Sequence, residues 1–122
     1  MKTEAPDPES MLPLTAATFH ILLALADQER HGYGIILEVE ARTGGALRLG
    51  AGTLYGSLKR MLEQGLIEET EERPDVELGD ERRRYYRLAP LGRSVALAEA
   101  RRLEALVQLA RTKRVLGSGV VQ

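Results

Sequence analysis

The chain has 122 residues, no cysteine, 43% hydrophobic residues and a formal net charge of -1. This length predicts a single domain, and the lack of cysteine excludes disulfide bridges, thiolate metal ligands and thiol nucleophiles. The near-neutral charge argues against a protein that coats nucleic acid through bulk charge.

The longest apolar run, from Phe19 to Ala26, is broken by His20 and is far too short to span a membrane. No charged leader precedes this run, so no secretory signal is expected. We therefore expect a cytoplasmic protein that has no membrane partner.

The amino-terminal residues 1–13 hold prolines and acids without a periodic pattern, and we expect a mobile arm there. Thr15 is a plausible N-cap for a first helix from Ala16 to Asp27. Apolar residues circle this helix almost completely. Because so small a domain can hardly bury its first helix on all sides, the pattern is a first indication of a homodimer.

Residues 28–34 contain two glycines and predict a turn. A second helix is expected from about Tyr33 to Thr43, and Gly44-Gly45 is a strong stop signal after it. A third helix follows a glycine-bearing link, as in a helix-turn-helix.

The third helix is expected between Thr53, a plausible N-cap, and Gly65, which occupies a C′ position. Its apolar residues form one stripe: Leu54, Leu58, Met61 and Leu62. Another set points roughly the other way: Thr53, Gly56, Lys59 and Arg60. A small, polar and basic face of this kind suits a helix that reads a DNA groove. The alternative is an ordinary amphipathic surface helix.

Two strands are expected at residues 66–72 and 82–88, joined by a hairpin loop at residues 73–81. The first strand is acidic and the second is basic. The arginines of the second strand could neutralise phosphates, or they could form ion pairs with the glutamates across the hairpin. Strand alternation predicts that Arg83 and Arg87 are the better-exposed pair, with Tyr86 facing the core.

A long helix is expected from Leu91 to Leu116, about 39 Å in length. It carries two adjoining apolar stripes, which are more than the small body can cover, so pairing with a second copy is expected. The predicted dimer interface consists of Phe19, Leu22, Leu23, Leu103, Leu106, Val107, Leu109 and Ala110.

These elements predict a mainly α fold, a winged helix-turn-helix with a two-stranded β wing and a long carboxy-terminal dimerisation helix. The expected divisions are an arm at 1–13, a DNA-binding domain at 14–89, a dimerisation helix at 90–116 and a frayed tail at 117–122.

Several short motifs occur in a fixed order: His31-Gly32-Tyr33-Gly34-Ile35, Gly44-Gly45, Gly52-Thr53-Leu54-Tyr55, Leu58-Lys59-Arg60-Met61, Gly65-Leu66-Ile67, Arg84-Tyr85-Tyr86-Arg87-Leu88 and Leu91-Gly92. Through these motifs the chain resembles the PadR family of transcriptional regulators, in its smaller size class. The resemblance implies a homodimeric repressor that binds a pseudo-palindromic operator in double-stranded DNA. Its third helix would enter the major groove, and its wing would touch the flanking backbone.

The sequence departs from the family pattern at two places. Gly56 stands where many members have proline, and the loop at 73–81 is longer and more acidic than a short Gly-Arg turn. The second departure weakens the expectation that the wing tip reaches a phosphate.

The residues expected to contact DNA are Arg48, Thr53, Tyr55, Ser57, Lys59, Arg60, Arg83 and Arg87. Hydroxyl groups and Lys59 suit phosphate, whereas Arg60 could reach a guanine edge. For Tyr55, packing of the ring is an equal alternative. Arg42 flanks the same turn as Arg48 and is expected to be solvated.

No enzyme is expected, because no nucleophile has a neighbouring base. His20 and His31 lie far apart without cysteine and give no metal site, and neither a phosphate-binding loop nor a cofactor is indicated. A small apolar effector between the first and last helices of two subunits is a further hypothesis. The rival function is a protein-binding adaptor that uses a winged-helix scaffold without touching DNA.

Overall fold

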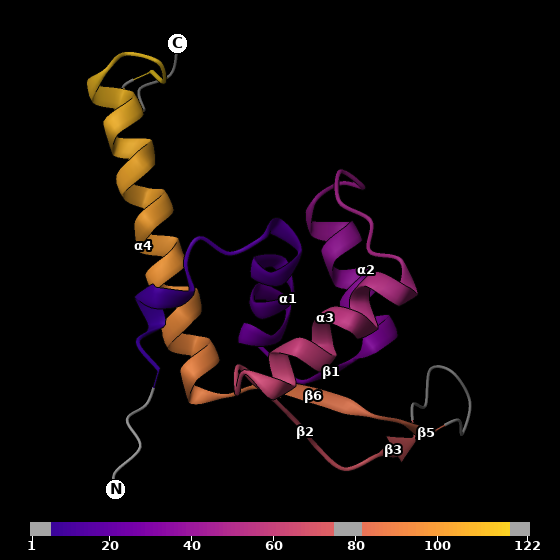
Figure 1. Cartoon of the computed structure of the whole chain (residues 1–122). Coiled ribbons are helices and arrows are strands. Elements are labelled where there is room, and N and C mark those ends of the chain that lie inside the picture. The colour runs from indigo at the N-terminus through magenta and orange to yellow at the C-terminus, as the bar shows by residue number, and fades with distance from the viewer. Residues whose placement is uncertain (1–5, 75–81, 118–122) are drawn as a thin grey trace, which may run out of the picture.

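A computed structural model describes residues 6–74 and 82–117 of the protein (Figure 1). Its elements, in chain order, are η1 (Pro8–Met11), α1 (Ala16–Ala26), β1 (Arg30–His31), α2 (Gly32–Arg42), α3 (Ala51–Glu63), β2 (Ile67–Glu69), β3 (Arg73–Pro74), β5 (Arg82–Arg83), β6 (Tyr85–Leu88) and α4 (Pro90–Thr112). The mainly α winged helix-turn-helix class predicted from the sequence is confirmed.

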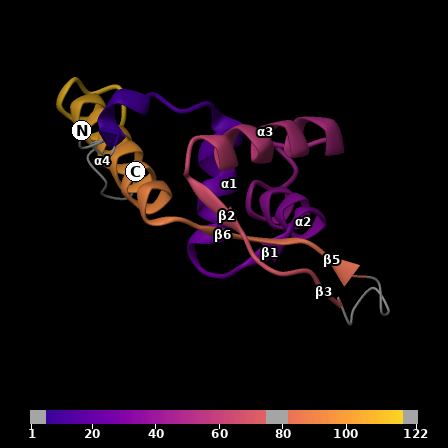
Figure 2. The same cartoon turned by 60° about the horizontal axis from the view of Figure 1, so that its bottom comes forward.

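The fold consists of a three-helix body, a narrow wing and a long projecting helix (Figure 1). Helices α1, α2 and α3 gather beside the small sheet, and the wing extends from the body on one side. Helix α4 rises on the other side, and its carboxy-terminal half extends beyond the body. Figure 2, turned from the first view, shows α3 as the outermost helix of the body.

Helix α1 begins where the sequence predicts it to begin. Thr15 is the N-cap, and its side chain accepts a hydrogen bond from the backbone N–H of Thr18. The expectation of a mobile arm is wrong for the residues just before it. Residues 8–11 form the short helix η1, which packs against α4, while residues 1–5 lie outside the described part of the chain.

The ends of α2 follow from two local signals. His31 is the N-cap, and its Nδ1 accepts a hydrogen bond from the N–H of Gly34 at 2.9 Å. After α2, Gly44 and Gly45 adopt positive φ angles, a conformation that side chains with a Cβ atom disfavour. The predicted stop is therefore confirmed, and the link to α3 occupies residues 43–50.

Helix α3 begins earlier than predicted and ends as predicted. Gly50, not Thr53, is the N-cap, and its carbonyl accepts the first helical hydrogen bond, from Leu54 N–H at 2.9 Å. At the other end Gly65 has a φ of 78°. The N–H of Leu66 donates to the carbonyl of Met61, which completes the motif expected of a glycine at C′.

The sheet includes β1, a strand that the sequence analysis does not predict, and each of the two predicted strands is divided into two shorter ones. β6 lies between β1 and β2 in a three-stranded antiparallel sheet, with Glu68 opposite Arg87 and Glu69 opposite Tyr86. Beyond it β3 pairs with β5, so the expected loop begins later than residue 73. The rest of that loop, residues 75–81, lies outside the described residues.

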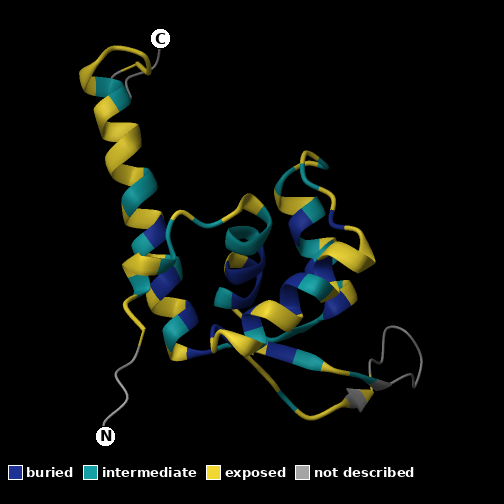
Figure 3. Cartoon of the chain, in the orientation of Figure 1, coloured by how far each residue is buried: buried dark blue, intermediate teal, exposed yellow. Residues whose placement is uncertain are grey.

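The core lies between the three body helices, the sheet and the first turns of α4 (Figure 3). At the start of α4, Gly92 touches the chain so closely that a Cβ atom there would overlap the backbone carbonyl oxygen of Leu66. Only Gly92, Val95 and Glu99 of α4 are buried. Helix α4 ends at Thr112 rather than at Leu116, and the tail residues 118–122 are outside the described part.

Candidate nucleic-acid interface

Helix α3 buries one face and exposes the other, as its sequence predicts. Its core-facing side chains are fully buried: Leu54, Leu58 and Met61. At 100° per residue, Gly52, Gly56 and Glu63 lie at the centre of the opposite face, and Lys59 lies beside them toward Tyr55. This face therefore combines one cation with two residues that have no side chain to hold a partner away.

Arg60 and Thr53 lie together on one edge of the exposed face. Both are exposed, and a guanidinium nitrogen of Arg60 donates to the Ser57 hydroxyl oxygen at 3.2 Å. Ser57 itself is only 3% exposed. The prediction that Ser57 contacts DNA is wrong, because its position turns the side chain toward the core, where its hydroxyl supports Arg60 instead.

Tyr55 lies on the other edge of the α3 face, where it both packs and remains accessible. Its side chain is 48% exposed, yet its ring lies against Gly32 at the start of α2. A Cβ atom at Gly32 would be 2.7 Å from Tyr55 Cζ. The packing alternative for Tyr55 therefore holds for the ring, while half of the side chain still faces solvent.

Arg48 and Arg42 flank the link between α2 and α3. Arg48 is highly exposed, and its Nε lies 3.4 Å from a Glu40 carboxylate oxygen. Arg42 forms a shorter ion pair, with its Nε 2.7 Å from Glu38 Oε2. This hydrogen bond is the main cause that raises the pKa of Arg42 above its ordinary value. Exposed pairs of this kind are weak, so a phosphate can compete for either arginine.

In the described part of the wing, arginines form ion pairs with glutamates across the hairpin, as one of the two sequence alternatives predicts. Arg87 Nε lies 3.0 Å from Glu68 Oε1, directly opposite in the strand register. Arg83 is only partly exposed. The prediction that Arg83 and Arg87 are the better-exposed pair is therefore wrong for Arg83.

Arg84 is one of the strand arginines that the sequence offers for phosphate contact or for pairing with glutamates, but it is not among the residues predicted to contact DNA. It lies between β5 and β6, where the strand is interrupted, and about half of its side chain is exposed. One guanidinium nitrogen is 3.3 Å from Glu69 and the other is 3.7 Å from Glu72. Arg84 is exposed although the alternation places it on the same face as the buried Tyr86, so the face alone does not decide which wing arginine is exposed.

The Arg84 pair lies on the face of the sheet that carries the core residue Tyr86. Glu69 is opposite Tyr86 in the register, and opposite residues share a face. Burial raises the pKa of the Tyr86 phenol, Glu69 and Tyr55 raise it further, and Arg84 lowers it. The Tyr86 phenol therefore lies close enough to Glu69, Tyr55 and Arg84 for each of them to affect its pKa.

The views agree on which side of the molecule these residues lie. In Figures 1 and 2 the amino-terminal end of α3 and the β3–β5 end of the wing lie on the same side of the body, and α4 lies on the other. The structure thus places the amino-terminal end of α3 and the wing on one side of the body, away from the projecting helix.

The predicted dimer residues divide into accessible and inaccessible groups. Four are substantially exposed on this single chain: Leu23, Leu106, Val107 and Leu109. Phe19, Leu103 and Ala110 are half-buried. Leu22 is 0% exposed and lies in the chain's own core, so its assignment to a dimer interface is corrected.

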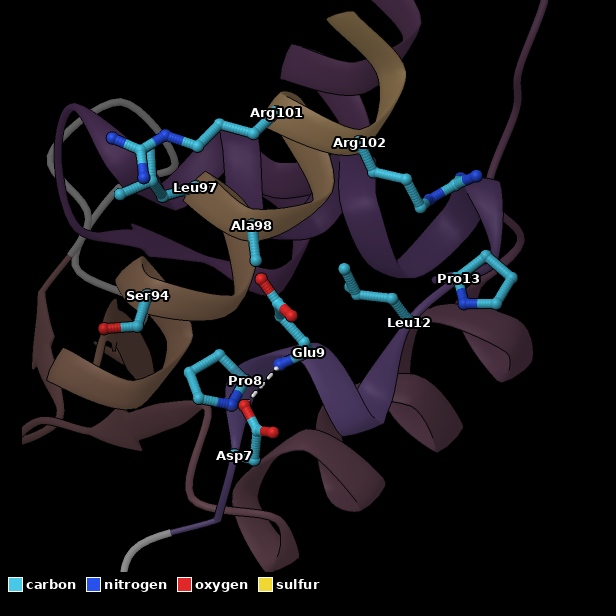
Figure 4. Close-up of a pocket in the computed structure, with 10 residues that line it drawn as sticks. All are labelled: Asp7, Pro8, Glu9, Leu12, Pro13, Ser94, Leu97, Ala98, Arg101 and Arg102. Atoms are coloured by element: carbon cyan, nitrogen blue, oxygen red, sulfur yellow. Dashed lines mark hydrogen bonds between the residues drawn. The ribbon is translucent and has the colours of Figure 1, made fainter. Parts of the chain in front are cut away.

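A groove of about 680 Å³ runs between the η1 segment and α4 (Figure 4). Leu12, Leu97 and Ala98 line it, and the Glu9 side chain points toward Ala98. Beside it the buried carboxylate of Glu99 accepts hydrogen bonds from Arg102 at 2.6 and 3.1 Å and from Leu14 N–H at 3.1 Å. The Arg102 hydrogen bond is the main cause that lowers the pKa of Glu99, against the effect of burial.

The two histidines take part in helix capping and packing. His31 caps α2 and meets Tyr85 edge-on, with ring centroids 5.3 Å apart, while His20 lines a smaller groove between α1 and α2. Within residues 6–74 and 82–117, no group of three or more metal-ligating side chains is placed to hold an ion. None of the described helices is long and apolar enough to cross a bilayer.

The sequence matches the profile of the Transcriptional regulator PadR-like family over residues 21–98. A curated relative, an uncharacterized 37.1 kDa protein in transposon TN4556 of Streptomyces fradiae, is 40% identical over 86 residues. That alignment covers 70% of this chain and 22% of the relative. The chain therefore spans less than a quarter of the relative's length.

Two solved structures show the same fold. A PadR family transcription regulator from Clostridium difficile R20291 has a TM-score of 0.65 at 22% identity, covering 80% of this chain and 97% of that chain. Bacillus subtilis PadR in complex with operator DNA has a TM-score of 0.60 at 20% identity, covering 70% of this chain and 47% of that chain. At these identities the likeness shows the fold alone.

Proposed function

The chain belongs to the PadR-like family of transcriptional regulators, and on that premise we propose that it is a sequence-specific DNA-binding repressor. It acts as a homodimer on a pseudo-palindromic operator. Helix α3 of each copy enters the major groove, and the wing lies beside the flanking backbone. Bacillus subtilis PadR, which has the same fold, is in complex with operator DNA.

The exposed face of α3 is the observation that carries this proposal. Lys59 lies between the centre of this face and the edge that carries Tyr55, Thr53 and Arg60 lie on the other edge, and no acid precedes Glu63 in the helix. Lysine and hydroxyl groups contact phosphate and fix the register, whereas arginine can donate two hydrogen bonds to a guanine edge. Arg48, at the entry to α3, adds a cation to the same surface.

Helix α4 supports the homodimer. Beyond Glu99 the helix leaves the body, and its apolar side chains Leu106, Val107 and Leu109 are exposed on a single chain. A second copy that packs on this stripe covers it and joins two winged-helix domains. Two-fold symmetry then relates the two α3 helices, which suits half-sites about 34 to 36 Å apart.

Footprinting on the DNA upstream of the protein's own gene tests the proposal. We expect two protected half-sites related by two-fold symmetry, with their centres about one helical turn apart. Lys59→Ala should remove the protection, and Arg101→Ala, which removes an exposed cation from α4, should retain it. Protection without symmetry would contradict the homodimer, and protection that survives Lys59→Ala would contradict the role of α3.

One observation favours the adaptor function as a second candidate. The arginines Arg84 and Arg87 are held by glutamates, so the wing offers little net positive charge to DNA. An adaptor would show no DNA affinity that falls with rising salt, whereas a phosphate-binding protein must show it. Titration of a random duplex at two salt concentrations therefore separates the two functions.

A small apolar effector that binds between the first and last helices of the two copies would regulate DNA binding. The exposed Leu23 of α1 and the exposed stripe of α4 support such a site. The groove beside η1 is less suited to an apolar molecule, because Asp7, Glu9 and Arg101 also line it. Thermal-shift screening of apolar compounds tests this proposal, and a screen without a stabilising compound would count against it.

A further inference from the structure

We propose that Glu69, together with Glu72, competes with DNA phosphate for Arg84 and thereby limits how strongly the wing binds DNA of any sequence. This inference rests on the proposed DNA-binding function and adds a specificity-determining residue to it. In this role Glu69 lowers non-specific affinity, so that discrimination between sequences comes from α3.

The first step is the geometry of Arg84. Its two terminal nitrogens lie 3.3 Å from Glu69 and 3.7 Å from Glu72, so one cation is shared by two carboxylates. The side chains of Arg84 and Glu72 are about half exposed to solvent, and that of Glu69 is 37% exposed. An accessible guanidinium of this kind is open to exchange, and a phosphate can replace a carboxylate as its partner.

The second step is the position of the pair. Glu69 is opposite the core residue Tyr86 in the register and holds Arg84, so this ion pair lies on the face of the sheet that packs against the body helices. The wing and the amino-terminal end of α3 lie on the same side of the body (Figures 1 and 2). DNA that is held by the exposed face of α3 would pass close to this pair.

The third step is what a phosphate contact contributes. Phosphate contacts fix the position of a protein on DNA but do not read sequence, and they supply most non-specific affinity. A carboxylate that holds Arg84 reduces this contribution, and its own negative charge repels the DNA backbone. Pairing with Arg84 and repulsion of the DNA backbone both weaken DNA binding, so removing the charge of Glu69 should strengthen binding to every duplex.

The neighbouring pair provides a matched control. Glu68 lies next to Glu69 on the same strand, and it also holds an arginine, with Arg87 Nε at 3.0 Å. Because successive strand residues point to opposite faces, the Glu68–Arg87 pair lies on the face away from α3. Glu68→Gln changes the net charge as much as Glu69→Gln does and also releases one arginine, Arg87, but on the face of the wing away from α3. The inference therefore gives Arg84, and not the Arg87 predicted from the sequence, the phosphate contact beside α3.

The test measures the affinity of the full chain for a fluorescent random duplex and for the footprinted operator duplex between 50 and 200 mM salt. Each additional neutralised phosphate steepens the plot of log affinity against log salt by about 0.9. We expect Glu69→Gln to show this steeper slope, to bind the random duplex more tightly and to have a smaller operator-to-random ratio. Glu68→Gln should stay near the wild type, and adding Arg84→Gln to Glu69→Gln should abolish the gain.

The thermal midpoints of both glutamine variants should equal that of the wild type, which shows that the wing is intact. Equal effects of Glu69→Gln and Glu68→Gln, or a gain that persists without Arg84, would overturn this inference alone, provided that the wild type binds its operator. If neither the wild type nor Glu69→Gln bound any duplex, the proposed function would be overturned and this inference with it.

Discussion

Gly32 at the start of α2 lies directly against the phenol ring of Tyr55 on α3. A Cβ atom at Gly32 would be 2.7 Å from Cζ of Tyr55 and 3.0 Å from Cε1. The two helices of the helix-turn-helix therefore approach each other through a glycine and an aromatic ring. Tyr55 also lies at the edge of the exposed face of α3, which we propose contacts DNA, so the same side chain packs between the two helices and borders the proposed interface.

Replacing Gly32 with alanine should force the Tyr55 ring to move. We expect the free energy of unfolding to fall by about 1 to 3 kcal/mol, the usual cost of overpacking. Chemical denaturation measures this free energy of unfolding. Gly52→Ala is the matched control, because a Cβ atom there meets nothing within 4 Å, and we expect this variant to be neutral or more stable. Equal stability of the two variants would refute the close packing at Gly32.

Tyr55→Phe separates the packing of the ring from the contact made by its hydroxyl group. The ring remains in place, so the stability of the protein should not change. If the hydroxyl group donates to a phosphate, the affinity for operator DNA should fall by about 0.5 to 1.5 kcal/mol, the net value of one hydrogen bond. Fluorescence anisotropy measures this affinity, and an unchanged affinity would leave Tyr55 with the packing role alone.

Glu99 should make the stability of the protein sensitive to acid. Its pKa is lowered, chiefly by the Arg102 hydrogen bond, so its contribution is complete above the unfolded pKa of about 4.3. That contribution is lost as the pH falls through the lower folded pKa, because the unfolded state binds the proton first. Thermal midpoints between pH 7 and pH 3 should therefore fall more for the wild type than for Glu99→Gln. Parallel pH profiles would show that Glu99 does not supply this sensitivity.

Two equally exposed leucines of α4 test the dimer. Leu106 is 49% exposed on the stripe that continues beyond the body, and Leu97 is 50% exposed beside the η1 groove. Burying a leucine contributes about 1.5 to 3 kcal/mol, and symmetry doubles the effect of one substitution. Leu106→Ser should therefore raise the dimer dissociation constant far more than Leu97→Ser in sedimentation equilibrium. If Leu97→Ser weakens the dimer more, the contact lies on the other face of α4.

The helices could be predicted because their signals are periodic and local. The stripe of α3 and the glycine stops at Gly44 and Gly65 each arise within a few residues. β1 was missed because Arg30–His31 is only two residues long and has no alternating pattern. Its strand character comes from pairing with β6, which is distant in sequence and therefore invisible to local reasoning.

The site residues were harder to predict because their exposure depends on the direction in which each side chain leaves its helix or strand. Ser57 differs from its outward-facing neighbour Gly56 by one step around the helix, and that step turns its hydroxyl inward. Arg84 is exposed although it shares a face with the core residue Tyr86, so alternation alone does not identify the exposed arginine. Glu99 had a usable signal, since an acid on the buried stripe with an arginine three residues later indicates a buried ion pair.

We propose that Arg60 and its neighbours on α3 read DNA. The affinity of Arg60→Ala for the operator and for a random duplex, with Arg101→Ala as the control, tests this role of α3. If Arg60 contacts a base edge, operator affinity should fall by about 1 to 3 kcal/mol while random-duplex affinity falls much less. An operator affinity equal to that of the wild type and of Arg101→Ala would contradict the claim.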